Sequence, residues 1–321
     1  MTRAFKPLDA TQLKTYPLSE RKSKTVLEDF ARPWTKGSDF KTFLEGLPNI
    51  LAGTDLIDVV SAVATAVSNQ KTVVLGMGAH VIKVGLNRVV IDLMERGVVS
   101  ALALNGAGII HDLELAMSGK TSEDVDASLD QGQFGMVQDT CDYYNQVMEK
   151  WDSRAKGLGQ WIGKSIVDSA LLYRQESILA AGARLDIPVT VHVAMGTDIL
   201  HMHPGFNPDR TGNATHADFK TFASVVATLE NGVYLNVGSA VILPEIFLKA
   251  VTLVRNLGHP LNRFTTVNMD FIQHYRPTTN VVNRPTAKGG KGYTLIGHHE
   301  ILVPLLAAGI IEQIDNAEPN P

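Results

Sequence analysis

A repeated pattern of apolar run, glycine turn and amphipathic segment constrains the fold of this chain more than any other feature. The first apolar run, residues 72–75, ends at Gly76 and Gly78, and the second, residues 98–104, ends at Asn105-Gly106-Ala107-Gly108. Apolar residues near helical spacing follow the first turn, and a second helix-like segment follows the other. The order strand, glycine turn, helix, repeated twice, predicts a βαβ unit.

The same alternation continues to the end of the chain. Further strands are expected at residues 187–193, 233–237, 264–270 and 293–296, and helices at residues 40–52, 55–68, 140–151, 165–183, 217–229, 244–256 and after residue 300. Strands that alternate with helices predict an α/β fold, here a Rossmann-like one with a largely parallel sheet flanked by helices. Residues 195–212 and 273–292 are expected to be irregular. We expect a single domain over residues 37–321, preceded by an N-terminal arm over residues 1–36.

Composition narrows the classes of function. The 321 residues carry a net charge of −4, so nothing favours non-specific binding to nucleic acid or to an anionic membrane. The single cysteine, Cys141, excludes an internal disulfide framework and fits a reducing compartment. The first residues lack the apolar region of a signal peptide, and no stretch approaches the roughly 18 to 20 apolar residues of a membrane span. We therefore expect a cytoplasmic protein.

The two glycine turns are candidate binding sites, because ligands of parallel sheets bind where strands lead into helices. Gly76-Met77-Gly78 lacks a third glycine at the spacing of a dinucleotide fingerprint, and Asn105 stands where an acidic residue is expected. One such turn is as compatible with a structural role as with a phosphate site. The occurrence of two turns in one βαβ unit favours a nucleotide-type ligand.

Three histidines lie close together in the sequence between residues 192 and 203. His192, His201 and His203 lie within twelve positions, near Asp198, and zinc can use such a set. No matching pattern of ligands follows downstream. Polar loop histidines are therefore the preferred interpretation, and no metal is expected.

Two further groups are candidates for chemistry near the C-terminus. The last expected strand is followed by His298-His299-Glu300, which fits residues of a pocket or a cap of the closing helix. Lys288 and Lys291 lie in the glycine-rich sequence AKGGKGY. A lysine whose pKa is lowered by burial can attack an imine or carbonyl centre, but solvated loop lysines are much commoner.

The order and spacing of several segments resemble the deoxyhypusine synthase family over residues 40–310. The matching pieces are Leu75-Gly76, Asn105-Gly106-Ala107-Gly108 with Asp112 in the following helix, Ile187-Pro188-Val189, the strand 233–238 with the helix that ends Leu253-Val254-Arg255-Asn256, Arg284-Pro285, and Leu302-Val303-Pro304-Leu305-Leu306. The specificity of the resemblance lies in this order and spacing rather than in any single motif.

The resemblance implies one Rossmann-like domain, NAD as the cofactor, and homotetramers with sites at dimer interfaces. In that family NAD takes a hydride from spermidine, and an aminobutyl group passes through an enzyme lysine to a protein lysine. Carried onto this chain, the cofactor would contact Gly76, Gly78, Asn105, Gly106, Ala107 and Asp112, and the end of the last strand, Gly297 and His298, would close over it.

The chain departs from the family at three places. The family's reactive lysine follows Trp-Gly, and its nearest equivalents here are Lys288 and Lys291 in a shortened loop. The family's paired histidines correspond to Pro244-Glu245, so Glu245 could act as a general base if burial raised its pKa. The family's acidic polyamine pocket corresponds to residues 275–280, YRPTTN, and Arg276 in that stretch does not suit a polycation.

We therefore expect an NAD-dependent transferase that resembles deoxyhypusine synthase, acts on a small and less cationic amine or carbonyl compound, and does not make deoxyhypusine. Lys288 or Lys291 would be the covalent or electrostatic group, with Glu245 or His298 as acid or base. The alternatives are a homospermidine synthase-like enzyme, a nucleotide-binding regulatory or structural protein without catalysis, and metal-dependent hydrolysis through His201 and His203.

Overall fold

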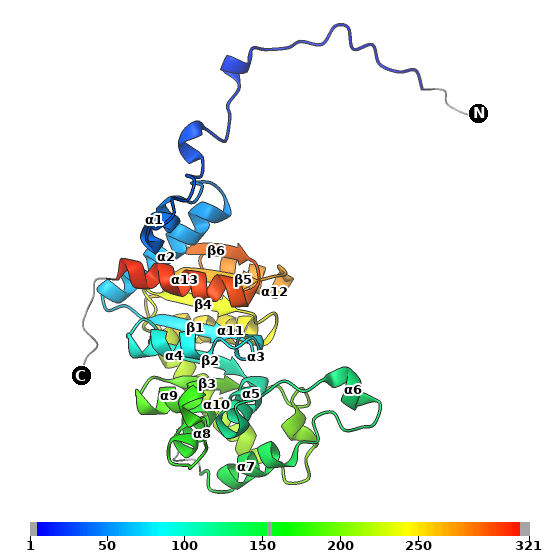
Figure 1. Ribbon diagram of the computed structural model, residues 1–321, viewed down its shortest axis with the longest axis vertical. Coiled ribbons are helices and arrows are strands. Elements are labelled where there is room, and N and C mark those ends of the chain that lie inside the picture. Colours follow the sequence, from blue (N-terminus) through cyan, green and yellow to red (C-terminus); the bar gives the residue numbers. More distant parts are fainter. Residues whose placement is uncertain (1–4, 153, 155, 315–321) are drawn as a thin grey trace.

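The computed structural model describes residues 5–152, 154 and 156–314, and within these residues it contains one six-stranded sheet (Figure 1). The strands are β1 (Val73–Met77), β2 (Ala101–Asn105), β3 (Val189–His192), β4 (Val233–Val237), β5 (Thr265–Asp270) and β6 (Lys291–Ile296). Their order across the sheet is β3-β2-β1-β4-β5-β6, and every pairing is parallel. The fold is therefore the Rossmann-like α/β fold that the sequence predicts.

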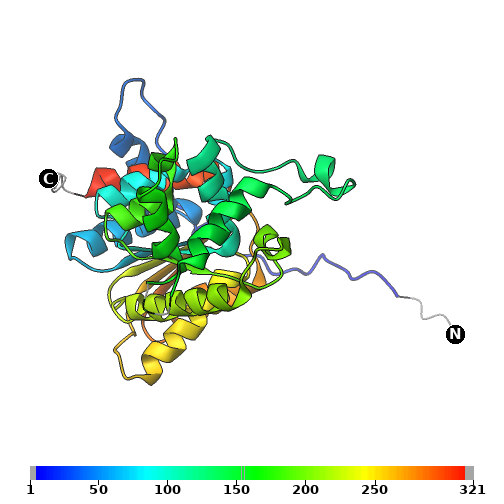
Figure 2. The ribbon, with the colours of Figure 1, turned by 90° about the horizontal axis from the view of Figure 1, so that it is seen from below.

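Helices cover both faces of the sheet (Figure 2). One face packs against α2 (Ala52–Ser68), α4 (Asn87–Glu95), α5 (Gly106–Ser118), α8 (Leu158–Val167), α9 (Ile178–Arg184) and α13 (His299–Gln313). The other face packs against α10 (Pro208–Val226), α11 (Ile242–Asn256) and the π-helix η5 (Thr278–Asn283). The shorter elements of the loops are α1 (Phe40–Glu45), α3 (His80–Lys83), α6 (Val125–Leu129), α7 (Gln138–Glu149), α12 (Tyr275–Pro277), η1 (Leu18–Glu20), η2 (Leu27–Asp29), η3 (Arg174–Glu176) and η4 (Ile199–Met202).

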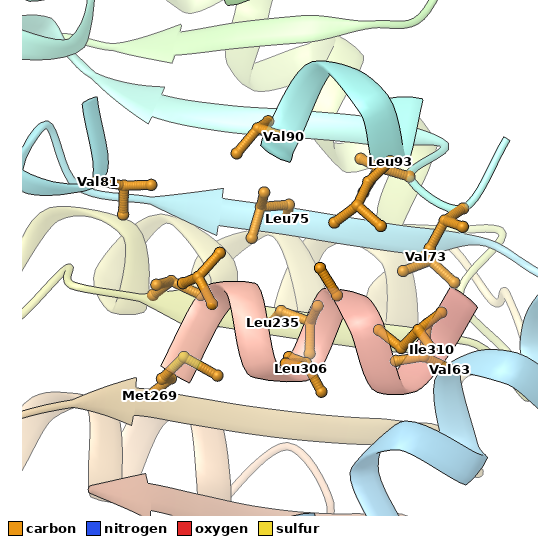
Figure 3. A pocket seen from close by; sticks show the side chains of 15 residues that line it. Val63, Val73, Leu75, Val81, Val90, Leu93, Leu235, Met269, Leu306 and Ile310 are labelled. Atoms are coloured by element: carbon orange, nitrogen blue, oxygen red, sulfur yellow. The ribbon is translucent and has the colours of Figure 1, made fainter. Parts of the chain in front are cut away.

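The larger part of the core lies between the sheet and helices α4 and α13. Leu75, Leu235 and Met269 come from three neighbouring strands and face Leu306 and Ile310 of α13 (Figure 3). A void of about 30 Å³ remains among these side chains, and apolar residues line it throughout. A water molecule in such a void would find too few polar partners, so the void belongs to the core.

The structure divides one helix that the sequence predicts as continuous over residues 165–183. Helix α8 ends at Val167, and α9 begins only at Ile178. Ser177 caps α9, because its hydroxyl oxygen accepts a hydrogen bond from the backbone nitrogen of Ala180. A capping residue within an apolar, helix-compatible stretch is a weak sequence signal, and it was missed.

Two stretches that the sequence predicts as irregular contain helices. Helix α10 begins at Pro208, because the side chain of Asn207 accepts a hydrogen bond from the backbone nitrogen of Arg210 and proline fits the first turn. The stretch 273–292 contains α12 and the π-helix η5. Both corrections bring extra helical structure to the face of the sheet that α11 covers.

The expected N-terminal arm consists mainly of exposed residues from position 5 to position 36. It extends away from the sheet (Figure 1) and carries exposed apolar side chains, among them Phe5, Leu8, Leu13 and Tyr16. Positions 1–4 lie outside the described residues. In the described part of the chain, no helix is both long and apolar enough to cross a membrane.

Candidate functional site

The strand order creates a switch point between β1 and β4. From β1 the chain proceeds to β2 on one side, and from β4 it proceeds to β5 on the other side. In open α/β sheets, ligands bind outside the carboxyl ends of the strands at such a point. Gly78 follows β1 and Gly238 follows β4, so these two glycines mark the candidate site.

The backbones of Gly78 and Gly238 approach each other too closely for side chains. A Cβ atom on Gly78 would lie 2.2 Å from the carbonyl oxygen of Gly238. The φ angle of Gly238 is +64°, in the left-handed region that favours glycine. Gly76 is different: a Cβ there would lie 2.5 Å from the hydroxyl oxygen of the buried Tyr234, so packing within the sheet accounts for this glycine.

The second glycine turn begins helix α5. The side chain of Asn105 accepts a hydrogen bond from the backbone nitrogen of Gly108 over 3.2 Å and caps the helix. The carboxylate of Asp198 lies against Gly106, where a Cβ atom would be only 1.9 Å from Oδ2. The loop after β3 therefore brings an acidic group to the end of β2, where the sequence has none. Burial raises the pKa of Asp198.

The histidines near Asp198 hold the same loop together. Nδ1 of His201 accepts hydrogen bonds from the backbone nitrogens of Gly196 and Asp198. Nε2 of His203 lies 3.0 Å from the carbonyl oxygen of Gly135. Among residues 5–152, 154 and 156–314, no group of three histidine, cysteine or acidic side chains is arranged to hold a metal ion.

Aromatic and imidazole rings form a cluster at the carboxyl ends of β1, β5 and β6. The rings of His80 and His299 are 5.3 Å apart between centroids and meet edge to face, with an angle of 63° between their planes. Phe271 contacts both rings and also stacks on His298, with centroids 6.0 Å apart. Sequence reasoning included His299, next to His298, in a candidate pocket, but it missed His80 and Phe271, because these rings meet His299 only when three strand ends lie side by side.

His299 is a buried imidazole with one unmatched nitrogen. Its Nε2 lies 3.3 Å from the carbonyl oxygen of Met269 and 3.8 Å from a carboxylate oxygen of Asp270. Its Nδ1 is buried and has no hydrogen-bond partner among the described residues. Burial lowers the pKa of His299, so the neutral form is favoured. A neutral ring that donates from Nε2 keeps a free lone pair on Nδ1.

A chain of buried amides lies on the strands beside this cluster. Nδ2 of Asn236 donates to the carbonyl oxygen of Ser239 and to Oδ1 of Asn268. Nδ2 of Asn268 donates in turn to Oε1 of Gln273 over 3.1 Å. Because Ser239 offers a carbonyl oxygen, it fixes which way each amide points. These bonds tie the carboxyl ends of β4 and β5 to the loop after β5.

Glu245 does not meet the condition under which it could serve as a general base. The Lys249 ammonium donates to one oxygen of its carboxylate, while the other lies 3.3 Å from Nε of Arg276 and accepts from Nδ2 of Asn280. The hydrogen bond from Lys249 and the nearby Arg276 lower the pKa of Glu245. The direction is opposite to the one that a general base near neutral pH requires.

The remaining candidates lie at the two opposite ends of β6. His298 stands at the N-cap of α13, and within the described chain its side chain makes no capping hydrogen bond. Lys288 and Lys291 lie at the amino end of β6, whereas Gly297 follows its carboxyl end. A strand of six residues is about 20 Å long, so within one chain the lysines lie at the edge opposite to the switch point.

Asp112 lies inside the protein and is not accessible at the carboxyl edge of the sheet. Its carboxylate accepts hydrogen bonds from Ser177, from the backbone nitrogens of Ile178 and Leu179, and from the amide of Asn87. Burial raises its pKa to about 6. The residue therefore supports the beginning of α9. Ala107, another candidate, lies in the first turn of α5.

Neither a family model nor a curated protein matches this sequence. Among solved structures, the fold is similar to AgrE in its ternary complex with ornithine and NAD+, at 16% identity over 81% of this chain and 33% of that chain, with a TM-score of 0.51. It is also similar to a protein of Entamoeba histolytica proposed to be a deoxyhypusine synthase, at 12% identity over 88% of this chain and 96% of that chain, with a TM-score of 0.54.

The fold defines the class: a six-stranded parallel sheet flanked by helices, of the deoxyhypusine synthase type. At these identities the similarity concerns the fold alone. The chain spans about a third of the length of AgrE.

Proposed function

We propose that this chain binds NAD at the carboxyl edge of its sheet and uses it in a transfer or hydride-transfer reaction. The substrate would be a small amine or carbonyl compound with less positive charge than spermidine. The observation that carries the proposal is the close approach of the Gly78 and Gly238 backbones at the switch point, which leaves main-chain groups without side chains at the carboxyl edge of the sheet. The similarity of fold to AgrE, whose complex holds ornithine and NAD+, supports it.

The residues around this contact suit the parts of a dinucleotide. Backbone groups at Gly238 and the start of α5 can approach a diphosphate without intervening side chains. Asp198 at the end of β2 is placed to accept hydrogen bonds from ribose hydroxyls, the role that an acidic residue plays in dinucleotide-binding folds. The turn Gly297-His298 would close over the cofactor.

Bound NAD supplies an acceptor for hydride. The chain's own contribution is the environment of the reacting atoms. Phe271 and His298 stack at the carboxyl edge, and the stacked pair would cover one side of a bound ligand. The unmatched Nδ1 of the neutral His299 ring can accept a hydrogen bond from an amine or hydroxyl group, and the exposed His80 packs beside this ring.

A second copy of the chain would complete the site, as in the tetramers of the family that the sequence resembles. Exposed apolar side chains surround the carboxyl edge: Met195, Val241, Phe271, Ile272, Ile296 and Ile301. Such a patch is typical of an interface. Lys288 and Lys291 would serve as the covalent or electrostatic group only if a neighbouring copy brought them to this edge.

The second candidate is a nucleotide-binding regulatory or structural protein without catalysis. Two observations favour it, because each removes a candidate catalytic group from the site. Glu245 is engaged in ion pairs with Lys249 and Arg276, and both lysines lie at the opposite edge of the sheet. A homospermidine-forming enzyme has less support, because Arg276 lies where a polycation would have to be held.

The reaction can be tested with the purified full chain, NAD and a panel of small amines and their carbonyl analogues. The proposal predicts reduction of NAD, or a transferred group found by mass spectrometry, with at least one member. His299→Asn should lower the rate about tenfold, the effect of losing one hydrogen bond worth about 1.4 kcal/mol. His259→Asn, at an exposed position after α11, should leave it unchanged. Binding of NAD without any turnover would favour the regulatory alternative.

A further inference from the structure

A cavity lies at the amino edge of the sheet, opposite to the switch point. Its volume is about 440 Å³, within the range of small-molecule sites. Val233, Thr265 and Lys291, the first residues of β4, β5 and β6, line it on the side of the sheet. Helix α2, which lies beside β6 (Figure 1), forms the other wall. The cavity therefore includes one of the two lysines that the sequence singles out.

One side of α2 supplies polar side chains to this cavity. Asp58, Ser61 and Thr65 are spaced three and four residues apart, so they lie on one side of the helix. The hydroxyl of Tyr293, which also lines the cavity, donates a hydrogen bond to Oδ2 of Asp58 over 3.0 Å. Burial and the neighbouring Asp58 raise the pKa of Tyr293 to about 12, so the hydroxyl keeps its proton. The other carboxylate oxygen of Asp58 has no partner among the described residues and is available to a ligand.

The strands bring two cationic side chains to the same cavity. Lys291 is exposed and forms no ion pair within the part of the chain that the structure describes. Arg263, just before β5, is 74% exposed, and its partner Glu230, at 3.5 Å, lies outside the lining. Lys291 and Tyr293 are two residues apart on one strand, so their side chains point to the same face. Asp58 and the two cations therefore line one cavity without being paired with one another.

Unpaired charges of both signs select among ligands. A simple anion would meet Asp58 as well as the two cations, and a simple cation would be repelled by Lys291 and Arg263. A molecule with both an ammonium and a carboxylate group can pair with both signs through charge-assisted hydrogen bonds. The remaining polar side chains of the lining make no side-chain hydrogen bond within the described residues and can bind a polar side chain of the ligand: Ser61, Thr65, Asn231 and Thr265.

We propose that this cavity binds a small polar zwitterion, the chemistry of a free amino acid, with its ammonium group at Asp58 and its carboxylate at Lys291 and Arg263. The proposal goes beyond the proposed function and does not depend on it, because the cavity and the switch point lie at opposite edges of the sheet. It gives Lys291 a role in binding within a single chain.

Calorimetric titration of the full chain tests the site with glutamine and with two molecules that each lack one of its charges. Glutaramate lacks the ammonium group, and 4-aminobutanamide lacks the carboxylate. Glutamine should bind saturably, and each of the other two should bind at least about tenfold more weakly, a difference of about 1.4 kcal/mol. Asp58→Asn and Lys291→Gln each remove one charge from the lining, so each should weaken glutamine binding about tenfold.

Lys288→Gln is the matched control, because Lys288 lies in the same loop, is exposed and does not line the cavity. It should leave the affinity for glutamine unchanged. Absence of glutamine binding at millimolar concentration would overturn the proposal, as would binding of either singly charged molecule as tightly as glutamine. Glutamine binding that neither Asp58→Asn nor Lys291→Gln weakens, in variants whose melting temperature is preserved, would also overturn it. Equal losses in Lys288→Gln and Lys291→Gln would contradict it too, because they would indicate the charge of the loop rather than this cavity.

Discussion

The carboxylate of Asp198 lies against the Cα atom of Gly106, although the two residues are far apart in the chain. Gly106 directly follows β2, and Asp198 lies in the loop after β3. A Cβ atom on Gly106 would lie 1.9 Å from Oδ2 of Asp198. The loop after β3 can therefore reach the beginning of α5 only because position 106 lacks a side chain. This contact joins the second glycine turn to the loop that carries His201 and His203.

Gly106→Ala should displace Asp198 and loosen this loop. Overpacking of this kind typically costs about 1–3 kcal/mol of unfolding free energy, which urea denaturation can measure. Gly212→Ala is the matched control, because it lies within α10 with no atom within 4 Å of its added Cβ. It should be neutral or stabilising by up to about 1 kcal/mol. Equal unfolding free energies for Gly106→Ala and the unaltered chain would contradict the contact.

Asp218 makes stability depend on pH. Its carboxylate accepts hydrogen bonds from the backbone nitrogens of Gly159 and Val191, and burial raises its pKa from 3.8 to about 7. Between about pH 4 and pH 7 the folded state therefore binds more protons at this group than the unfolded state. Its contribution to stability is complete below about pH 4 and is lost as the pH rises to about 7.

Asp218→Asn should remove this contribution from the curve of unfolding free energy against pH. The variant should show a smaller decrease, or a larger increase, from pH 4 to pH 7 than the unaltered chain. His192, whose pKa is lowered by burial, has the opposite effect, so the informative quantity is the difference between the two curves. Parallel curves would mean that Asp218 titrates normally in the folded state.

Leu306 should be important for stability because it lies at the centre of the contact between α13 and the sheet. Leu306→Ala removes a buried side chain next to an existing void, and such changes cost about 2–5 kcal/mol. Leu257→Ala, at a position 66% exposed, should change stability by less than about 0.5 kcal/mol. The comparison can be made by urea denaturation of the two variants. Similar small losses of unfolding free energy for Leu306→Ala and Leu257→Ala would contradict the packing of α13 against the sheet.

The exposed apolar side chains around the carboxyl edge of the sheet should form an interface with a second copy of the chain. Light scattering on the full chain should give the mass of an oligomer, and Ile301→Asp should lower that mass, because a charge would have to be buried in the interface. Leu129→Asp, an exposed position on the distant α6, should leave the mass unchanged. A monomeric unaltered chain would refute the shared site.

The sheet could be predicted from the sequence because its central strands β1, β2 and β4 are mainly apolar runs that end at glycine or polar residues. Every expected strand forms, with ends shifted by up to three residues. Helix boundaries were less predictable. The split of residues 165–183 depends on Ser177 and Asp112, which meet through tertiary structure.

The site was only partly predictable. The glycine turns are visible in the sequence because backbone geometry demands glycine, and Gly78 does lie at the switch point. Asp198, His80, Phe271 and His299 could not be grouped, since they are far apart in the chain and none belongs to a spaced motif. Lys288 and Lys291 were candidates because lysine can act as a nucleophile, but they lie at the amino end of β6, opposite to the switch point.

Binding of NAD tests the central claim most directly. Calorimetric titration of the full chain with NAD should give saturable binding with one site per chain. Gly78→Ala, whose Cβ would press on the carbonyl of Gly238, and Asp198→Asn should each weaken binding at least about tenfold, while Gly212→Ala should not. Absence of binding at millimolar NAD, or equal affinity in all three variants, would contradict the proposal that the switch point is a dinucleotide site.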